Sequence, residues 1–189
     1  MNAAEQYVYF AMEVSSPLSK RCLGSARPFT MIILDRNQQE IMHIKRPLRC
    51  RNCCCFCCLQ RIEVQVPPGN PIGYIEQEVT FMTPRFRVYN EARQAVLKVE
   101  GPVCTAACFR DVDYYVTENL NLNPVVTVNE RGPQVELVGK LSKTWMGILH
   151  EATTDADHYA LNFKPDLDVT TKASLLGISF LIDFMFYDT

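Results

Sequence analysis

The C-terminal segment constrains the fold of this chain most strongly. Residues 173–187 are apolar on every side of a helix except at Ser174, Ser179 and Asp183, and Thr170 is the predicted N-cap. A helix that is hydrophobic all round lies either in a membrane or at the centre of a protein. At about 1.5 Å per residue this segment is about 22 Å long, whereas the hydrocarbon core of a bilayer is about 30 Å thick.

Length and charge favour the buried helix. Asp183 would add roughly 2.5–3.5 kcal/mol to the cost of insertion near the centre of a membrane helix. We therefore predict a helix surrounded by strands, in which Ser174 and Gly177 let strand backbones approach closely. Asp183 then needs a buried partner or a place at the mouth of the barrel. A short membrane span is the alternative, because mismatched spans exist.

Short alternating segments separated by prolines and glycines predict a mainly β domain. Ile62, Val64 and Val66, for example, alternate with polar residues as in a half-buried strand. A chain of 189 residues is long enough for one core, and its formal net charge of -2 argues against a general nucleic-acid binder. The predicted strands are residues 7–11, 29–34, 41–44, 61–66, 72–78, 85–89, 95–99, 112–117, 125–129, 135–141 and 158–163, with hairpin turns at 35–38 and 90–93.

A run of cysteines indicates sulfur chemistry. Adjacent side chains of an extended chain point to opposite faces, so these cysteines cannot all pack into one core. The odd total of nine cysteines fits a disulfide framework poorly, and the first residues do not resemble a signal peptide. We therefore predict reduced, cytosolic thiols. The run consists of Cys53, Cys54, Cys55, Cys57 and Cys58.

Acylation and zinc binding are the two main interpretations of this run. Acylation is favoured because stable anchoring usually takes a second signal, such as a basic patch that is attracted to anionic lipid. The predicted membrane-surface residues are Lys45, Arg46, Arg49 and Arg51, and Arg61 follows the run. Zinc is the alternative, because Cys50 and Cys53 have zinc-knuckle spacing, and a more distant cysteine or histidine would complete the ligands.

Several motifs resemble the phospholipid scramblase family. They are RPL-x-C-x-x-CCC-x-CCLQ-x-IE-x-Q-x-PPG-x-PIGY at residues 46–74, RPFT at 27–30, GKLSK at 139–143 and FLIDFMF at 180–186. The resemblance covers nearly the whole chain from about residue 5. It implies one scramblase domain, residues 1–189, that contains the cysteine-rich segment 50–58 and the C-terminal helix 170–187.

The fold implied by the resemblance is tubby-like: a closed antiparallel β-barrel of up to twelve strands around the C-terminal hydrophobic helix. Compared with the family pattern, we expect the Pro-rich N-terminal region of the family and its first strand or two to be missing from this chain. We therefore expect the barrel to be incomplete at its N-terminus, or the sequence to be truncated. An insertion at residues 119–133 lengthens the connection before Gly139.

The resemblance also implies a function. It implies calcium-stimulated, ATP-independent scrambling of phospholipids between leaflets by a palmitoylated protein on the cytoplasmic face of the plasma membrane. Import receptors and a nuclear location are implied when the protein is not acylated. The alternative is a membrane-tethered adaptor that binds lipids or proteins and signals to the nucleus without scrambling. We find no nucleophile with an adjacent base and no phosphate-binding loop, so a bond-making enzyme is not predicted.

Two further sites are implied by the family. Its calcium segment corresponds to residues 155–166, with Asp155, Asp157 and the short Asp166 as ligands. Because Tyr159 and Phe163 stand where an EF-hand needs oxygen ligands, we expect a weak site, with an affinity of about 10⁻⁴–10⁻³ M. A strand flanked by solvated carboxylates is the alternative. The import-like segment contains Gly139, Lys140, Lys143 and Trp145, and a barrel strand is its default interpretation.

Overall fold

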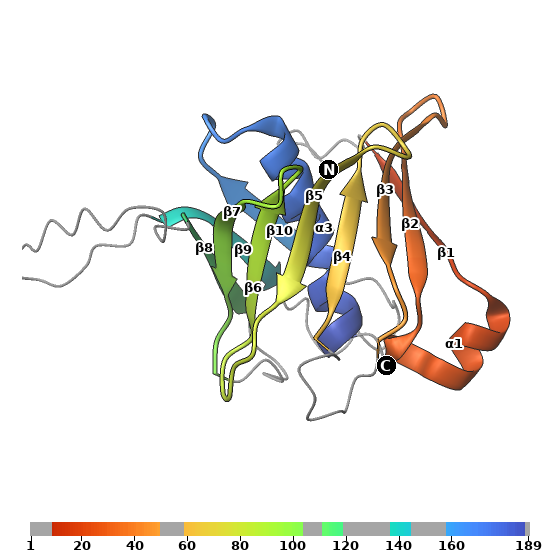
Figure 1. The fold of residues 1–189 in the computed structure, drawn as a ribbon, viewed down its shortest axis with the longest axis horizontal. Coiled ribbons are helices and arrows are strands. Elements are labelled where there is room, and N and C mark those ends of the chain that lie inside the picture. Colours follow the sequence, from red (N-terminus) through yellow and green to blue (C-terminus); the bar gives the residue numbers. More distant parts are fainter. Residues whose placement is uncertain (1–8, 50–58, 104–110, 119–136, 145–157, 188–189) are drawn as a thin grey trace, which may run out of the picture.

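One antiparallel sheet forms most of the molecule (Figure 1). The computed structural model describes residues 9–49, 59–103, 111–118, 137–144 and 158–187. In this part of the chain ten strands are arranged so that each pairs with its neighbours in the sequence. They are β1 (Phe10–Val14), β2 (Phe29–Leu34), β3 (Glu40–Arg46), β4 (Arg61–Gln65), β5 (Pro71–Gln77), β6 (Arg85–Asn90), β7 (Ala95–Glu100), β8 (Val112–Glu118), β9 (Leu137–Thr144) and β10 (His158–Phe163).

Local sequence explains the turns between these strands. Asp35 accepts hydrogen bonds from the backbone N–H groups of Asn37 and Gln39 at 2.8 and 2.9 Å. Asn90 accepts one from Gln94 N at 2.9 Å. Such side chains replace backbone hydrogen bonds in tight turns. The two predicted hairpins, β2–β3 and β6–β7, are therefore confirmed.

Some element bounds, and the segment between β1 and β2, differ from the prediction. The strand predicted at 7–11 begins later, at Phe10, and the one predicted at 135–141 continues to Thr144. Between β1 and β2 lie the helix α1 (Pro17–Leu23) and the 3-10 turn η1 (Gly24–Ala26), neither of which was predicted. Ser16 caps α1 by accepting from Ser19 N. The strand predicted at 125–129 lies outside the described residues.

The C-terminal helix α3 (Val169–Phe186) lies in the hollow of the curled sheet, as Figure 1 shows. No residue from 173 to 187 is exposed, so the prediction that these residues belong to the core is confirmed. The inward side chains of the strands alternate with outward polar ones and pack against Leu175, Ile178, Leu181 and Ile182. This packing removes apolar surface from water, and each Å² buried stabilises the fold by about 25 cal/mol.

Small residues let α3 approach the sheet. A Cβ built on Gly177 would lie 2.9 Å from Val64 Cγ2, and one built on Gly73 in β5 would overlap Ser174 Oγ. The predicted close approach of a strand backbone is therefore confirmed at Ser174, whereas Gly177 makes room for strand side chains, those of Val64 and Ile62. Of the two alternatives predicted for Asp183, the structure shows a partner, because the half-buried Tyr159 donates from Oη to Asp183 Oδ1 at 2.9 Å.

The predicted N-cap of the C-terminal helix, Thr170, is wrong. Thr170 is inside the helix, and Asp168 caps it by accepting from the backbone N–H groups of Thr170 and Thr171 at 3.0 and 3.3 Å. The hydrogen bond from the Thr170 hydroxyl, together with these backbone bonds, lowers the pKa of Asp168. A carboxylate here also complements the positive end of the helix dipole.

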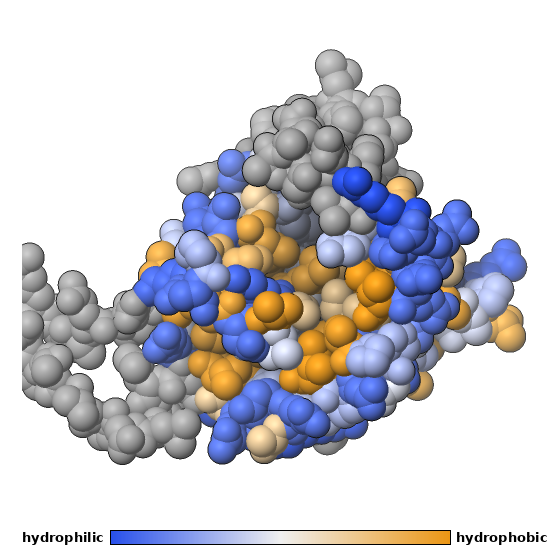
Figure 2. Space-filling view, turned by 90° about the horizontal axis from the view of Figure 1, so that it is seen from above, coloured by the Kyte–Doolittle hydropathy of each residue, from blue (hydrophilic) through white to orange (hydrophobic). Residues whose placement is uncertain are grey.

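The closed barrel of the prediction is not confirmed. Within the described residues β1 pairs only with β2 and β10 only with β9, so the sheet curls around α3 without joining its two edges. Closure needs a hydrogen-bonded partner for each edge strand. Seen from the end where α3 begins, apolar side chains gather in the middle of the molecule inside a rim of polar ones (Figure 2).

Candidate functional site

The cysteine-rich segment connects β3 to β4, and the structure describes the two stems that carry it, residues 46–49 and residues 59–62. Cys53, Cys54, Cys55, Cys57 and Cys58 lie outside the described residues, as does Arg51. β3 and β4 pair only at His43–Gln65, Ile44–Val64 and Lys45–Glu63. Beyond Lys45 and Glu63 the ladder stops, and the two chains continue into the stems.

Polar contacts join these stems across the base of the segment. Arg46 Nε and Nη2 donate to Gln60 Oε1 at 3.1 and 2.7 Å, and Arg49 Nη1 donates to Leu59 O at 3.0 Å. Gln60 N in turn donates to Gln77 Oε1 of β5 at 3.1 Å. The two ends of the cysteine-rich segment are therefore held together at the sheet.

Arg46 corrects the predicted set of membrane-surface residues. Its side chain is 3% exposed, and its guanidinium lies 5.7 Å from the centre of the Phe29 ring. Arg46 is therefore buried, although its charge suggested a surface position. Of the predicted basic residues, Lys45 is exposed and Arg49 is half-buried.

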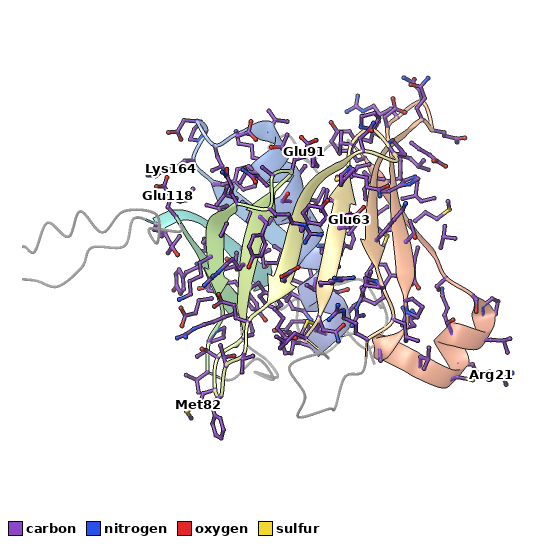
Figure 3. All side chains as sticks on the ribbon, viewed as in Figure 1. Arg21, Glu63, Met82, Glu91, Glu118 and Lys164 are labelled. Carbon is purple, nitrogen blue, oxygen red and sulfur yellow. The ribbon has the colours of Figure 1, made fainter. Side chains whose placement is uncertain are left out.

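A groove of about 520 Å³ lies beside these stems. It is lined by residues from the first five strands, from the start of α1, and by Arg93 of the turn between β6 and β7. The outward side chains Lys45, Arg61 and Glu63 belong to this lining, and Figure 3 labels Glu63 beside β4. The groove was not predicted, because its walls come together only when five strands pair.

One wall of the groove is an ion pair with an aromatic support. Arg93 Nη1 lies 3.2 Å from Glu76 Oε1, and the Arg93 guanidinium lies 3.3 Å from the centre of the Tyr74 ring. Both contacts hold the Arg93 side chain over β5. Such partly exposed pairs add little to stability, typically about 0–1 kcal/mol, but they fix the position of the charge.

The predicted calcium ligands are only partly described. Asp155 and Asp157 lie outside the described residues, and Asp166 is exposed in the turn between β10 and α3. Tyr159, Leu161 and Phe163 pack against the core from β10, as expected for one face of a strand. Among the described residues no group of three or more His, Cys, Asp or Glu side chains is arranged to hold a metal ion.

The import-like segment forms part of β9. Gly139 is buried against β10, since a Cβ there would lie 2.8 Å from Asn162 O. Lys143 Nζ lies 3.5 Å from the centre of the Tyr187 ring at the end of α3. Trp145 lies outside the described residues. The strand predicted as the default for this segment is therefore confirmed for residues 137–144.

The other lysine of this segment, Lys140, is held by an ion pair. Lys140 Nζ lies 2.9 Å from Asp113 Oδ2 on the neighbouring strand β8. The hydrogen bond to Asp113 raises the pKa of Lys140. Burial opposes the ionisation of Asp113, but the hydrogen bonds from Lys140 and Ser142 outweigh it and lower the pKa of Asp113.

α3 meets the length and hydropathy of a membrane span. An 18-residue window over Val169–Phe186 has a mean hydropathy of 1.4, and 50% of it is buried in the fold. A buried core helix passes the same test, and here the sheet covers the helix. The described part of the chain therefore uses this segment as core.

Comparison with known proteins gives a consistent result. The model of the Scramblase family matches residues 1–189. The chain is 45% identical to human phospholipid scramblase 1 over 188 residues, 42% identical to phospholipid scramblase 2 from Bos taurus, and 37% identical to human phospholipid scramblase family member 5. These alignments cover 99–100% of this chain but only 55%, 59% and 64% of the relatives. No solved structure matches.

Proposed function

This chain belongs to the Scramblase family, and we propose from that membership that it moves phospholipids between the two leaflets of a membrane. The observation that carries the proposal is the family match over residues 1–189, together with relatives named as phospholipid scramblases. The chain spans little more than half of the first of these relatives. The activity, the substrates and the partners of the whole protein are therefore all part of the proposal.

The finer features of the proposal follow the family pattern. Movement is independent of ATP and is stimulated by calcium, bound weakly by Asp155, Asp157 and Asp166. The cysteine run is palmitoylated and holds the protein on the cytoplasmic face of the plasma membrane. Zinc at the cysteine run is the competing proposal for these thiols. The arrangement of the stems supports a run presented at one edge of the domain, next to exposed Lys45.

Reconstitution tests this function. The purified full chain is placed in vesicles that carry fluorescent phospholipid, and leaflet exchange is measured with and without calcium, in the absence of ATP. We expect faster exchange with calcium. A Gly177→Val variant is the control, because its side chain would push α3 away from Val64 and Ile62. Equal exchange in protein-free and protein-containing vesicles would refute the proposal.

The calcium site has its own test. We expect Asp155→Ala and Asp157→Ala each to weaken the calcium response clearly, because each removes a charge from a site that has few ligands. Calorimetric titration with calcium measures the effect, and Glu91→Ala at an exposed turn between β6 and β7 is the matched control. If both aspartate variants respond like the wild type, the residues are ordinary solvated carboxylates.

A membrane-tethered adaptor is the second candidate function. The observation in its favour is the cover of α3 by the sheet, because no residue from 173 to 187 is exposed at the surface. In this proposal the domain binds lipids or proteins, and its unacylated form enters the nucleus through import receptors. A protein that binds membranes but leaves leaflet exchange unchanged in the vesicle assay would support the adaptor.

A further inference from the structure

Two exposed cations in the groove have no partner among the residues that the structure describes. Lys45 at the end of β3 and Arg61 at the start of β4 make no ion pair or side-chain hydrogen bond in the described structure. Other cations of the same sheet are paired: Arg85 and Lys98 with Glu100, Arg87 with Glu78, Arg93 with Glu76 and Lys140 with Asp113. Lys45 and Arg61 are therefore available for an anionic ligand.

A carboxylate stands between these cations. Glu63 is directly opposite Lys45 in the β3–β4 ladder and two residues from Arg61 on the same face of β4. One of its oxygens, Oε1, accepts from Gln65 Nε2 at 2.6 Å. A carboxylate at this place repels a ligand that carries only negative charge, and it attracts a ligand that also carries a positive group.

The distances on the sheet suit a ligand with neighbouring charges of opposite sign. Side chains directly opposite each other on paired strands are about 5 Å apart at Cβ, and those two residues apart on one strand are about 6.5–7 Å apart. In aminophospholipids a short ethylene link separates the phosphodiester from the primary ammonium. Lys45 and Arg61 match the phosphodiester, and Glu63 matches the ammonium.

We propose that this groove binds the headgroup of an aminophospholipid, with the phosphodiester between Lys45 and Arg61 and the ammonium on Glu63. The proposal deepens the proposed function, on which it rests for the presence of the protein at a membrane. Both stems of the cysteine-rich segment contribute to the lining of the groove, through Arg46 and Pro47 on one side and Arg61 and Ile62 on the other. Acyl chains on that segment would therefore hold the groove at the headgroup layer. Such tethering raises the effective concentration of the ligand.

Vesicle binding tests the proposal with lipids of equal net charge. The unacylated full chain is mixed with phosphatidylcholine vesicles that contain the same fraction of either phosphatidylserine or phosphatidylglycerol. Of the two anionic lipids only phosphatidylserine carries an ammonium group, and the phosphatidylcholine content is the same in both vesicles, so we expect tighter binding to phosphatidylserine. Glycerophosphoserine should compete for the groove, and inorganic phosphate at the same ionic strength should not.

Three variants locate the effect. Lys45→Ala and Arg61→Ala should each weaken binding to phosphatidylserine about tenfold, the usual effect of losing one charge-assisted hydrogen bond. Glu63→Gln should abolish the preference for phosphatidylserine over phosphatidylglycerol. The controls are Arg21→Ala, which removes one positive charge as Arg61→Ala does, and Glu118→Gln, which removes one negative charge as Glu63→Gln does. Both residues lie far from Glu63 (Figure 3), so both variants should bind like the wild type.

The outcomes separate this inference from the proposed function. Equal binding of the wild type to both anionic lipids, or equal losses in Arg61→Ala and Arg21→Ala, would overturn the headgroup site even if the protein scrambles lipid. A preference for phosphatidylserine that depends on Glu63 would support the site even if leaflet exchange is unchanged. In that case the scrambling proposal alone would fail.

Discussion

At the scale of single residues, a chain of charged and aromatic side chains ties the end of α3 to the sheet. Phe184 of α3 stacks on Phe29 of β2 with ring centres 4.1 Å apart. The Arg27 guanidinium lies 4.6 Å from the centre of the Phe184 ring, and Arg46 lies over Phe29. Arg27 is 9% exposed and bonds Glu13 of β1 at 2.8 and 3.0 Å. A buried charge of this kind needs its partner.

Glu13→Gln should therefore destabilise the fold in a pH-dependent way. The hydrogen bond from Arg27, helped by Ser15, lowers the pKa of Glu13 from 4.5 to about 2, against the opposing effect of burial. Because the folded pKa is depressed, the stabilisation is present above pH 4.5 and is lost as the pH falls toward 2. At neutral pH we expect a loss of up to about 3 kcal/mol.

Urea unfolding at several pH values measures this difference. The difference in the free energy of unfolding between the wild type and Glu13→Gln should become smaller as the pH is lowered from 4.5 to 2. Glu40→Gln is the control, since this residue is exposed and its carboxylate pairs only with His43 among the described residues. If this free-energy difference is the same at every pH, Glu13 does not stabilise the fold through its charge.

Sequence reasoning at this scale was right about residue character and wrong about some positions. The partner expected for Asp183 exists, because a carboxyl group on an apolar helix must be satisfied in any fold. Arg46 was assigned to the surface from its place in a basic cluster. Its burial depends on Phe29 and Gln60, which come from other segments and meet it only when β2, β3 and the second stem assemble.

At the scale of elements, the contact between β5 and α3 depends on a pair of small residues. A methyl group on Gly73 would overlap Ser174 Oγ, but the next helix atom, Ser174 Cβ, lies 3.5 Å away, at ordinary contact distance. Tyr89 O at 3.2 Å is the remaining tight neighbour. The hydroxyl of one residue therefore sets the space available to the other.

Gly73→Ala should destabilise the protein by about 1–3 kcal/mol, the usual cost of overpacking a core. Adding Ser174→Ala should restore part of this loss, because the overlapping oxygen is removed. Thermal unfolding of both single variants and the double variant measures the coupling energy. Purely additive effects would mean that α3 shifts away from β5 as a whole and that the two residues are not specifically matched.

Element boundaries show which local signals are strong. The turns at Asp35 and Asn90 were predicted from side chains that bond their own backbone, an effect confined to four residues. The start of α3 was misplaced by two residues because Asp168 and Thr170 are both good capping residues. Helix α1 has a cap at Ser16 and Pro17 in its first turn, but no buried residue, so no apolar periodicity revealed it.

At the scale of the whole molecule, α3 supplies much of the core. Its large buried side chains are Leu175, Ile178, Leu181, Ile182, Phe184 and Met185. Each contributes roughly 1.5–3 kcal/mol, whereas the total stability of a domain is about 5–15 kcal/mol. Deleting residues 170–189 should therefore abolish folding of the entire domain. Differential scanning calorimetry measures this, and a cooperative melt of the truncated chain would contradict the role of α3 as core.

Membrane association should depend on the cysteine run. Replacing Cys53, Cys54, Cys55, Cys57 and Cys58 by alanine should move the protein from the membrane to the soluble or nuclear fraction, because the acyl chains are lost. Circular dichroism should stay rich in β-structure. Cys22→Ala is the control, since Cys22 is exposed on α1 and outside the run. An unfolded variant, with stoichiometric zinc in the wild type, would support the zinc site instead.

The sequence by itself determined the features that depend on near neighbours. Alternation predicted most strands, turn residues predicted the hairpins, and an all-round apolar helix required a surrounding sheet. Only the tertiary structure decided the burial of Arg46, the groove beside the stems, and the open pairing of β1 and β10 within the described residues. These features join segments that are far apart in the chain, and their geometry depends on strand register and sheet curvature, which no short sequence window contains.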